Sequence, residues 1–161
     1  MSSLTDRFFR HMEWANSYVF DQMAKLSEAE LLLTAPKDDW NAAAILEHLV
    51  PTGYSHRLDG LDRAETFIPK NSLEVIALKE ISTALDARLR AAAKTPEGFV
   101  EFTRDGIGYR HARQTILAQS IHHATEHRAQ IAGIYASHGM KIIDLDSIDL
   151  WAFADYEGVG D

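Results

Sequence analysis

Apolar residues recur every three or four positions through four long stretches of this 161-residue sequence. This spacing matches the 3.6-residue turn of an α-helix, so it places the apolar side chains on one face of each helix. The predicted helices cover residues 4–26, 41–60, 71–94 and 109–138, the last with an alternative start at residue 111. Few segments alternate as strands do. The pattern therefore predicts an all-α fold, a four-helix bundle with residues 1–161 as a single domain.

Polar residues, a glycine and a proline mark where these helices begin, bend and end. Ser27, Asn41 and Asn71 each stand at the start of a helical stretch, as good N-caps do. Gly139 follows the last long stretch as a C′ glycine. Pro51 lies inside the second stretch and removes a backbone hydrogen bond there, so we expect a kink next to it.

The third stretch and the connections after it give more specific expectations. The predicted buried stripe of residues 71–94 consists of Leu73, Ala77, Ile81, Leu85 and Leu89. Residues 98–108 are predicted as a loop that lets the fourth helix cross over, with a short extended piece at 99–103. Asp146 and Ser147 are expected to cap a last short helix through Phe153.

Charge and residue composition exclude several classes of function. The net charge of −8, without a basic cluster, argues against a nucleic-acid partner and against a polybasic membrane contact. The absence of cysteine excludes disulfides, thiolate metal ligands and a cysteine nucleophile. No apolar run approaches the length of a membrane span, and the first residues do not resemble a signal peptide. We therefore expect a cytoplasmic protein.

The pair His123 and His127 carries the clearest chemical signal in the sequence. The two residues are four positions apart in the last long helical stretch, so their side chains lie about 40° apart on one face. Two imidazoles placed in this way can hold one divalent metal ion. A third ligand is needed, and His48 in the second predicted helix is the obvious donor.

The remaining histidines have weaker claims to a chemical function. Single histidines on a mixed helix face are more often structural than functional. His11, His111, His122 and His138 are interpreted in this way. His56 lies eight residues after His48, about 80° around the same predicted helix, and is expected to line the same cavity.

A competing motif overlaps the histidine pair. Residues 123–127 match the H-x-x-E-H pattern of inverted zinc peptidases, in which Glu126 would act as a general base. That interpretation needs an acidic third ligand further along the chain. The acidic residues after His127 lie in a predicted loop and a short terminal segment, so we rank this interpretation below the three-histidine site.

Three segments of the chain resemble a known family. The sequence Glu-Trp-Ala-Asn at 13–16 is similar to the first-helix signature of the DinB-like superfamily, which includes the YfiT-like proteins and thiol-dependent transferases. Residues 41–49 resemble the segment that carries its first metal histidine. Residues 123–131, His-Ala-Thr-Glu-His-Arg-Ala-Gln-Ile, resemble its H-x-x-x-H-R-[GA]-Q-[IL] segment. The usual close of the family is matched by Gly139, Asp144 and Trp151, whereas Pro51 has no counterpart in its pattern.

The resemblance implies a four-helix bundle with a crossover connection, often as a homodimer. It also implies a divalent metal on His48, His123 and His127, most commonly zinc or nickel, with iron, manganese or copper as alternatives. Three imidazoles leave positions on the metal open for water or a substrate, as in catalytic sites.

The resemblance also implies the chemistry expected at those open positions, since some members of the superfamily transfer a low-molecular-weight thiol. Transfer of a low-molecular-weight thiol to a small-molecule substrate is the favoured reaction, and the thiol must come from outside because the chain has no cysteine. A hydrolase that uses metal-bound water and a non-catalytic metal-binding or stress-response protein are the alternatives. Gln130 is predicted to line the pocket, Glu126 is a candidate general base, and Arg128 is expected to form a surface or partner contact.

Overall fold

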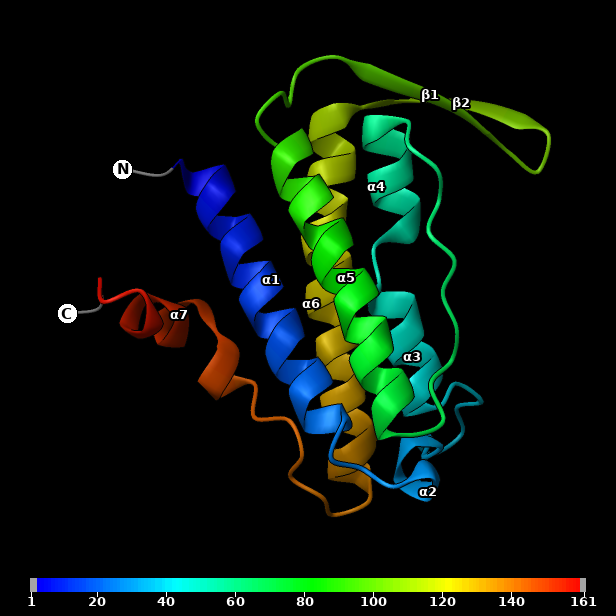
Figure 1. Ribbon diagram of the computed structural model, residues 1–161, viewed down its shortest axis with the longest axis vertical. Coiled ribbons are helices and arrows are strands. Elements are labelled where there is room, and N and C mark those ends of the chain that lie inside the picture. Colours follow the sequence, from blue (N-terminus) through cyan, green and yellow to red (C-terminus); the bar gives the residue numbers. More distant parts are fainter. Residues whose placement is uncertain (1–2, 160–161) are drawn as a thin grey trace.

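Helical segments lie side by side along the long axis of the computed structural model, which describes residues 3–159 (Figure 1). They are α1 (Leu4–Met23), α3 (Ala42–Leu49) followed by α4 (Thr52–Asp59), α5 (Ser72–Ala92) and α6 (Arg113–Ser137). The short helix α2 (Glu28–Leu31) joins the first two of them. The predicted helical fold is therefore confirmed. No helix within residues 3–159 combines the length and the apolar character that crossing a membrane requires.

The helices do not alternate simply in direction. Figure 1 shows α3 and α4 running opposite to α1, and α5 running in the same direction as α3 and α4. Residues 60–71 make this parallel arrangement possible, because they extend along the outside of the bundle back to the start of α5. The crossover connection therefore lies at 60–71 and not at 98–108, where we predicted it. After Gly60, which has a left-handed φ of 72°, the sequence has no helical spacing until Ser72.

The segment predicted as a loop before the last long helix is a β-hairpin. Strands β1 (Phe99–Arg104) and β2 (Ile107–Ala112) pair antiparallel, with Arg104 opposite Ile107. The two turn residues, Asp105 and Gly106, both have positive φ, 52° and 77°. An Asp-Gly pair in this conformation is the preferred two-residue hairpin turn. The predicted extended piece at 99–103 is confirmed, but the predicted helix start at 109 or 111 is wrong, since α6 begins at Arg113.

The second predicted helix is broken rather than kinked. Val50 has an extended conformation, with φ −65° and ψ 122°, because the ring of the following proline disfavours a helical residue before it. The chain turns at Pro51 and starts again as α4. The backbone N–H and the hydroxyl of Ser55 both donate to the Pro51 carbonyl. As a result, His48 lies in the last turn of α3, next to the break.

The buried face of α5 differs from the predicted stripe. Leu73 is 78% exposed and Ala77 is also exposed, whereas Val75 and Leu78 are buried. The buried face also includes two polar residues, Ser82 and Asp86. Its apolar residues in this half of the helix are Leu85, Leu89 and Ala92. A prediction based on apolar spacing cannot find a stripe whose middle is polar.

The predicted helix caps are largely confirmed. Ser27 forms a complete capping box with Glu30, and Gly139 ends α6 with a φ of 71°. The side chains of Asn41 and Asn71 accept hydrogen bonds from the first turns of α3 and α5. The last helix, α7 (Leu150–Tyr156), is capped by Asp149, while the predicted caps Asp146 and Ser147 lie in a 3-10 turn before it.

Candidate metal centre

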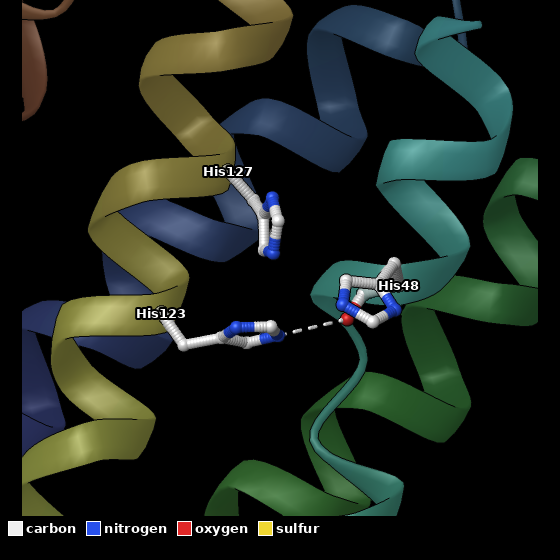
Figure 2. Close-up of side chains that lie close together, drawn as sticks. All are labelled: His48, His123 and His127. Carbon is white, nitrogen blue, oxygen red and sulfur yellow. Dashed lines mark hydrogen bonds between the residues drawn. The ribbon is translucent and has the colours of Figure 1, made fainter. Parts of the chain in front are cut away.

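The structure brings His48, His123 and His127 together between α3 and α6 (Figure 2). Each ring offers one nitrogen, and these three nitrogens all lie within 4.8 Å of one another. His123 and His127 point from successive turns of α6 toward His48 at the end of α3. The predicted juxtaposition of these three residues is therefore observed, and the group could hold a metal ion.

His127 is the most buried of the three, at 5% exposure, because it lies on the core-facing stripe of α6. Its Nδ1 lies 2.5 Å from Oε1 of Gln130, three residues further along the helix. A carbonyl oxygen can only accept, so Nδ1 carries the proton and donates it to Gln130. The lone pair of Nε2 is then free, which is the tautomer that binds metal through Nε2.

His123 is half-buried, and its Nε2 lies 3.3 Å from the backbone carbonyl of His48 (Figure 2). Burial, followed by the electrostatic interaction with the neighbouring His127, lowers the pKa of His123 to about 4. Burial, followed by His127, also lowers the pKa of His48. Both rings are thus neutral at pH 7, as metal ligands must be. A metal that uses Nε2 of His123 would displace the hydrogen bond to the carbonyl, and the proton would then reside on Nδ1.

Aromatic rings enclose this cluster on two sides. The ring centroid of Trp40 lies 4.8 Å from that of His48 and 5.8 Å from that of His127. Tyr54, from α4, lies 5.3 Å from His123. Burial raises the pKa of Tyr54, so its hydroxyl stays protonated at neutral pH. Between them, these two rings contact all three imidazoles, of which His48 remains exposed to solvent.

A cleft of about 760 Å³ lies beside the histidine cluster and is lined by residues from α3, α4, the crossover segment, β1 and α6. His48 and His123 line it, as does His56, which agrees with the expectation for that residue. The remaining lining residues come from α3, α4, the crossover segment and β1: Glu47, Val50, Thr52, Gly53, Tyr54, Arg57, Arg63, Phe102, Thr103 and Arg104. The cluster is thus reached from solvent through a cleft large enough for a small organic molecule.

Arg128 was predicted to lie at the surface or on a partner, and this is wrong. It is only 4% exposed, and its guanidinium donates to Oδ1 of Asn16 at 2.7 Å and to Oγ1 of Thr125 at 3.0 Å. Asn16 in turn donates to Oδ2 of Asp86 at 3.2 Å. This network joins α6, α1 and α5 through Arg128, the residue that follows His127 in the chain.

The sequence contains a signal for this network, namely polar residues that share the helical spacing of buried apolar ones. Asn16 lies four residues after Met12 and four before Phe20, and both of these are buried. Arg128 lies four residues after the buried Ala124. A polar residue in phase with an apolar stripe is expected to be buried with a polar partner.

The other candidates lie outside the cluster. Glu126 is exposed and is not among the described residues that line the cleft. Gln130 is also exposed and acts on His127 rather than on the cleft. The third residue beside the histidine pair is His48 and not an acid, so the inverted-peptidase pattern lacks its acidic ligand within residues 3–159.

Two of the four histidines interpreted as structural contact other parts of the fold. His11 is half-buried against Trp14 and Phe153, with its Nε2 2.8 Å from the carbonyl of Ile148. His138 bonds the carbonyl of Thr34 at 2.8 Å.

Comparisons with known proteins give one match. The sequence model of the DinB family matches residues 1–151, a range that contains all three clustered histidines. No curated protein and no solved structure matches the chain.

Proposed function

The chain belongs to the DinB family, and from this premise we propose that it is a metal-dependent enzyme that transfers a low-molecular-weight thiol to a small-molecule electrophile. The observation that carries the proposal is the convergence of three imidazole nitrogens from two helices. No fourth histidine, cysteine, aspartate or glutamate joins this group within the described residues. Three protein ligands with open positions are typical of catalytic sites, whereas structural zinc sites are closed by four.

The residues present fit a divalent metal such as zinc or nickel. Imidazole nitrogens suit both ions, and Gln130 holds the ring of His127 in the orientation that ligation through Nε2 requires. When bound, the metal would act as a Lewis acid that lowers the pKa of a thiol or a water molecule beside it. Trp40 and Tyr54 border the same position and limit the access of water.

The proposed reaction needs no reactant other than the thiol and the electrophile. The thiol sulfur forms a bond to an electrophilic carbon, and the bond from that carbon to its leaving group breaks. The leaving group keeps the electron pair of that bond, and the thiol proton passes to solvent. The chain contributes no sulfur nucleophile of its own, because it has no cysteine.

Elemental analysis of the purified protein tests the metal site. We expect about one equivalent of a divalent metal in the natural protein and its loss in His123→Ala and in His127→Ala. His122→Ala, which changes an exposed neighbour, is the matched control and should keep the metal. Circular dichroism should show unchanged helicity in all variants. Absence of metal from the natural protein after reloading, or retention in both ligand variants, would overturn the site.

Activity assays then separate the possible reactions. The metal-loaded protein is offered electrophiles with and without added thiols, and esters and amides without thiols. Turnover that requires a thiol supports the proposal. Turnover of esters or amides without a thiol identifies a hydrolase, and stable metal binding without any turnover identifies a non-catalytic metal-binding protein.

A further inference from the structure

The cleft beside the histidine cluster is lined by more positively than negatively charged side chains, although the protein as a whole is acidic. Three arginines line it, each from a different segment: Arg57 from α4, Arg63 from the crossover at 60–71 and Arg104 from β1. Glu47 is the single carboxylate among the described lining residues, and its Oε1 already accepts a hydrogen bond from the Thr66 hydroxyl. In a chain with a net charge of −8, this cleft is a local concentration of positive charge.

Among the residues that the structure describes, the contacts of these three arginines leave most of their N–H donors available. The guanidinium of Arg57 lies 4.3 Å above the ring of Phe102, a stacking contact that uses its face and not its N–H groups. Arg63 uses its Nε to donate to Oγ1 of Thr52 at 3.3 Å. Arg104 has a distant contact of 3.5 Å with Asp105, and both side chains are at least 70% exposed, so this pair is weak.

Other arginines of the chain are placed differently. Arg7, Arg88 and Arg90 each pair with a carboxylate, at 3.1, 2.6 and 3.1 Å. An arginine on a solvated face usually finds such a partner in an acidic protein. The cleft arginines instead gather where the protein supplies little negative charge, and like charges repel unless an anion joins them. The planar guanidinium matches the two oxygens of a carboxylate or a phosphate.

We propose that this arginine cleft binds a carboxylate or phosphate group of the small molecule whose reactive end reaches His48 and His123. The proposal deepens the proposed function and rests on it, since it adds an anionic group to one of the two reactants. The volume of about 760 Å³ lies in the range of small-molecule sites. The main binding residues are Arg57, whose guanidinium stacks on the ring of Phe102, and Arg63. Arg104 adds positive charge at the end of the cleft next to the hairpin.

The first experiment detects anion binding without any metal. The metal-free, full-length protein, labelled with ¹⁵N in arginine, is titrated with inorganic phosphate and, separately, with succinate. We expect the Nε–H signals of Arg57 and Arg63 to shift with a common Kd, while Arg110 on the outer hairpin does not shift. The anion with the lower Kd shows whether the natural group is a phosphate or a carboxylate. Absence of shifts at both cleft arginines with either anion contradicts the proposal.

The second experiment connects the cleft to the metal. The cobalt-loaded protein is titrated with 3-mercaptopropionate and with the uncharged 2-mercaptoethanol, and the sulfur-to-cobalt absorption band reports binding. We expect the anionic thiol to bind at least ~10-fold more tightly, the effect of one charge-assisted bidentate pair. The preference should disappear in the double variant Arg57→Ala, Arg63→Ala and persist in Arg110→Ala. An equal affinity for the two thiols, or a preference that the double variant keeps, contradicts the proposal.

The two experiments separate this inference from the proposed function. Arginine shifts in the metal-free protein, with no sulfur-to-cobalt band for either thiol, would support the anion site and contradict thiol binding at the metal. A sulfur-to-cobalt band without arginine shifts or anion preference would support thiol binding and overturn the arginine cleft.

Discussion

At the scale of single residues, Gln130 is the clearest test of how the metal centre is held. Its Oε1 accepts the Nδ1 proton of His127 and fixes both the tautomer and the ring orientation. Loss of such a partner typically weakens metal affinity about 10- to 100-fold. We therefore expect a Gln130→Ala variant to show a Kd for zinc that is higher by about this factor, measured by competition with a chromophoric chelator.

The control for Gln130 is another glutamine of the same helix. Gln114 is also exposed on α6 but lies more than three turns away from His127. Gln114→Ala should leave the Kd for zinc unchanged. An equal Kd in the natural protein and in Gln130→Ala would show that His127 does not need this hydrogen bond.

Arg128 gives a residue-scale prediction about stability. Its guanidinium donates hydrogen bonds to Asn16 and Thr125 in the network that joins α6 to α1 and α5. Arg128→Ala removes a large buried side chain and leaves a buried Asn16 oxygen without its donor. We expect a loss of about 2–4 kcal/mol in the free energy of unfolding, measured by urea denaturation. Arg110→Ala, at an exposed position, should change it by less than about 0.5 kcal/mol, and a similarly small effect for Arg128 would contradict the network.

At the scale of elements, the hairpin shows what spacing can and cannot predict. The extended piece at 99–103 was predicted from alternation, but its partner strand was predicted as part of the following helix. The decisive local signal was the pair Asp105 and Gly106 between two alternating segments, which favours a tight hairpin turn. The break between α3 and α4 had an equally local cause in Pro51, whose effect on Val50 is stronger than a kink.

Gly106 allows a test of the hairpin as an element. Its φ of 77° is unfavourable for any residue with a side chain, by about 1 kcal/mol. A Gly106→Ala variant should therefore increase the hydrogen-exchange rates of the β1 and β2 amides by roughly 5-fold. The core amides of α1 and α5 should exchange as before, because most residues of the hairpin are exposed. Unchanged hairpin exchange would contradict the turn geometry.

At the scale of the whole molecule, the parts of the site differ in how predictable they were. His123 and His127 share one helical face, so their proximity follows from the sequence alone. His48 was the obvious third donor from another helix, and the family resemblance supported it. The arginine cleft was not predictable in this way. Arg57, Arg63 and Arg104 meet only because α4, the crossover and the hairpin pack around one space. The single domain, the homodimer and the cytoplasmic location stay predictions.

Asp86 connects the protonation of one group to the stability of the whole bundle. It lies between α1 and α5, and burial raises its pKa from 3.8 to about 7, against the hydrogen bond from Asn16. The nearby Glu13 raises this pKa further, while Arg128 lowers it. Its Oδ1 has no hydrogen-bond partner within the described residues, which suits a protonated carboxyl. The folded protein thus binds a proton here that the unfolded chain releases near pH 4.

The stability that this proton supplies should be lost as the pH rises. Between about pH 4 and pH 7 the folded state holds more protons at Asp86 than the unfolded state, so the free energy of unfolding falls with increasing pH. The full effect is on the order of a few kcal/mol. Buried histidines such as His123 have the opposite effect on the pH dependence. Their pKa is lowered in the folded protein, so at acid pH the unfolded chain binds more protons, and the free energy of unfolding rises with increasing pH. Comparing the natural protein with a variant at Asp86 isolates the contribution of Asp86, because the histidines contribute equally to the pH dependence of both proteins.

The measurement is urea denaturation of the natural protein and of Asp86→Asn at pH 5 and at pH 8. Asparagine keeps the shape and the acceptor for Asn16 but has no proton to lose. We compare the free energy of unfolding of Asp86→Asn with that of the natural protein at each pH. The difference, variant minus natural protein, should increase by a few kcal/mol from pH 5 to pH 8. Asp105→Asn, at the exposed hairpin tip, is the matched control and should show an almost constant difference between the two pH values. A constant difference for Asp86→Asn as well would mean that Asp86 titrates alike in the folded and unfolded protein. The buried network would then hold an ionised carboxylate, paired with the charge of Arg128, at neutral pH.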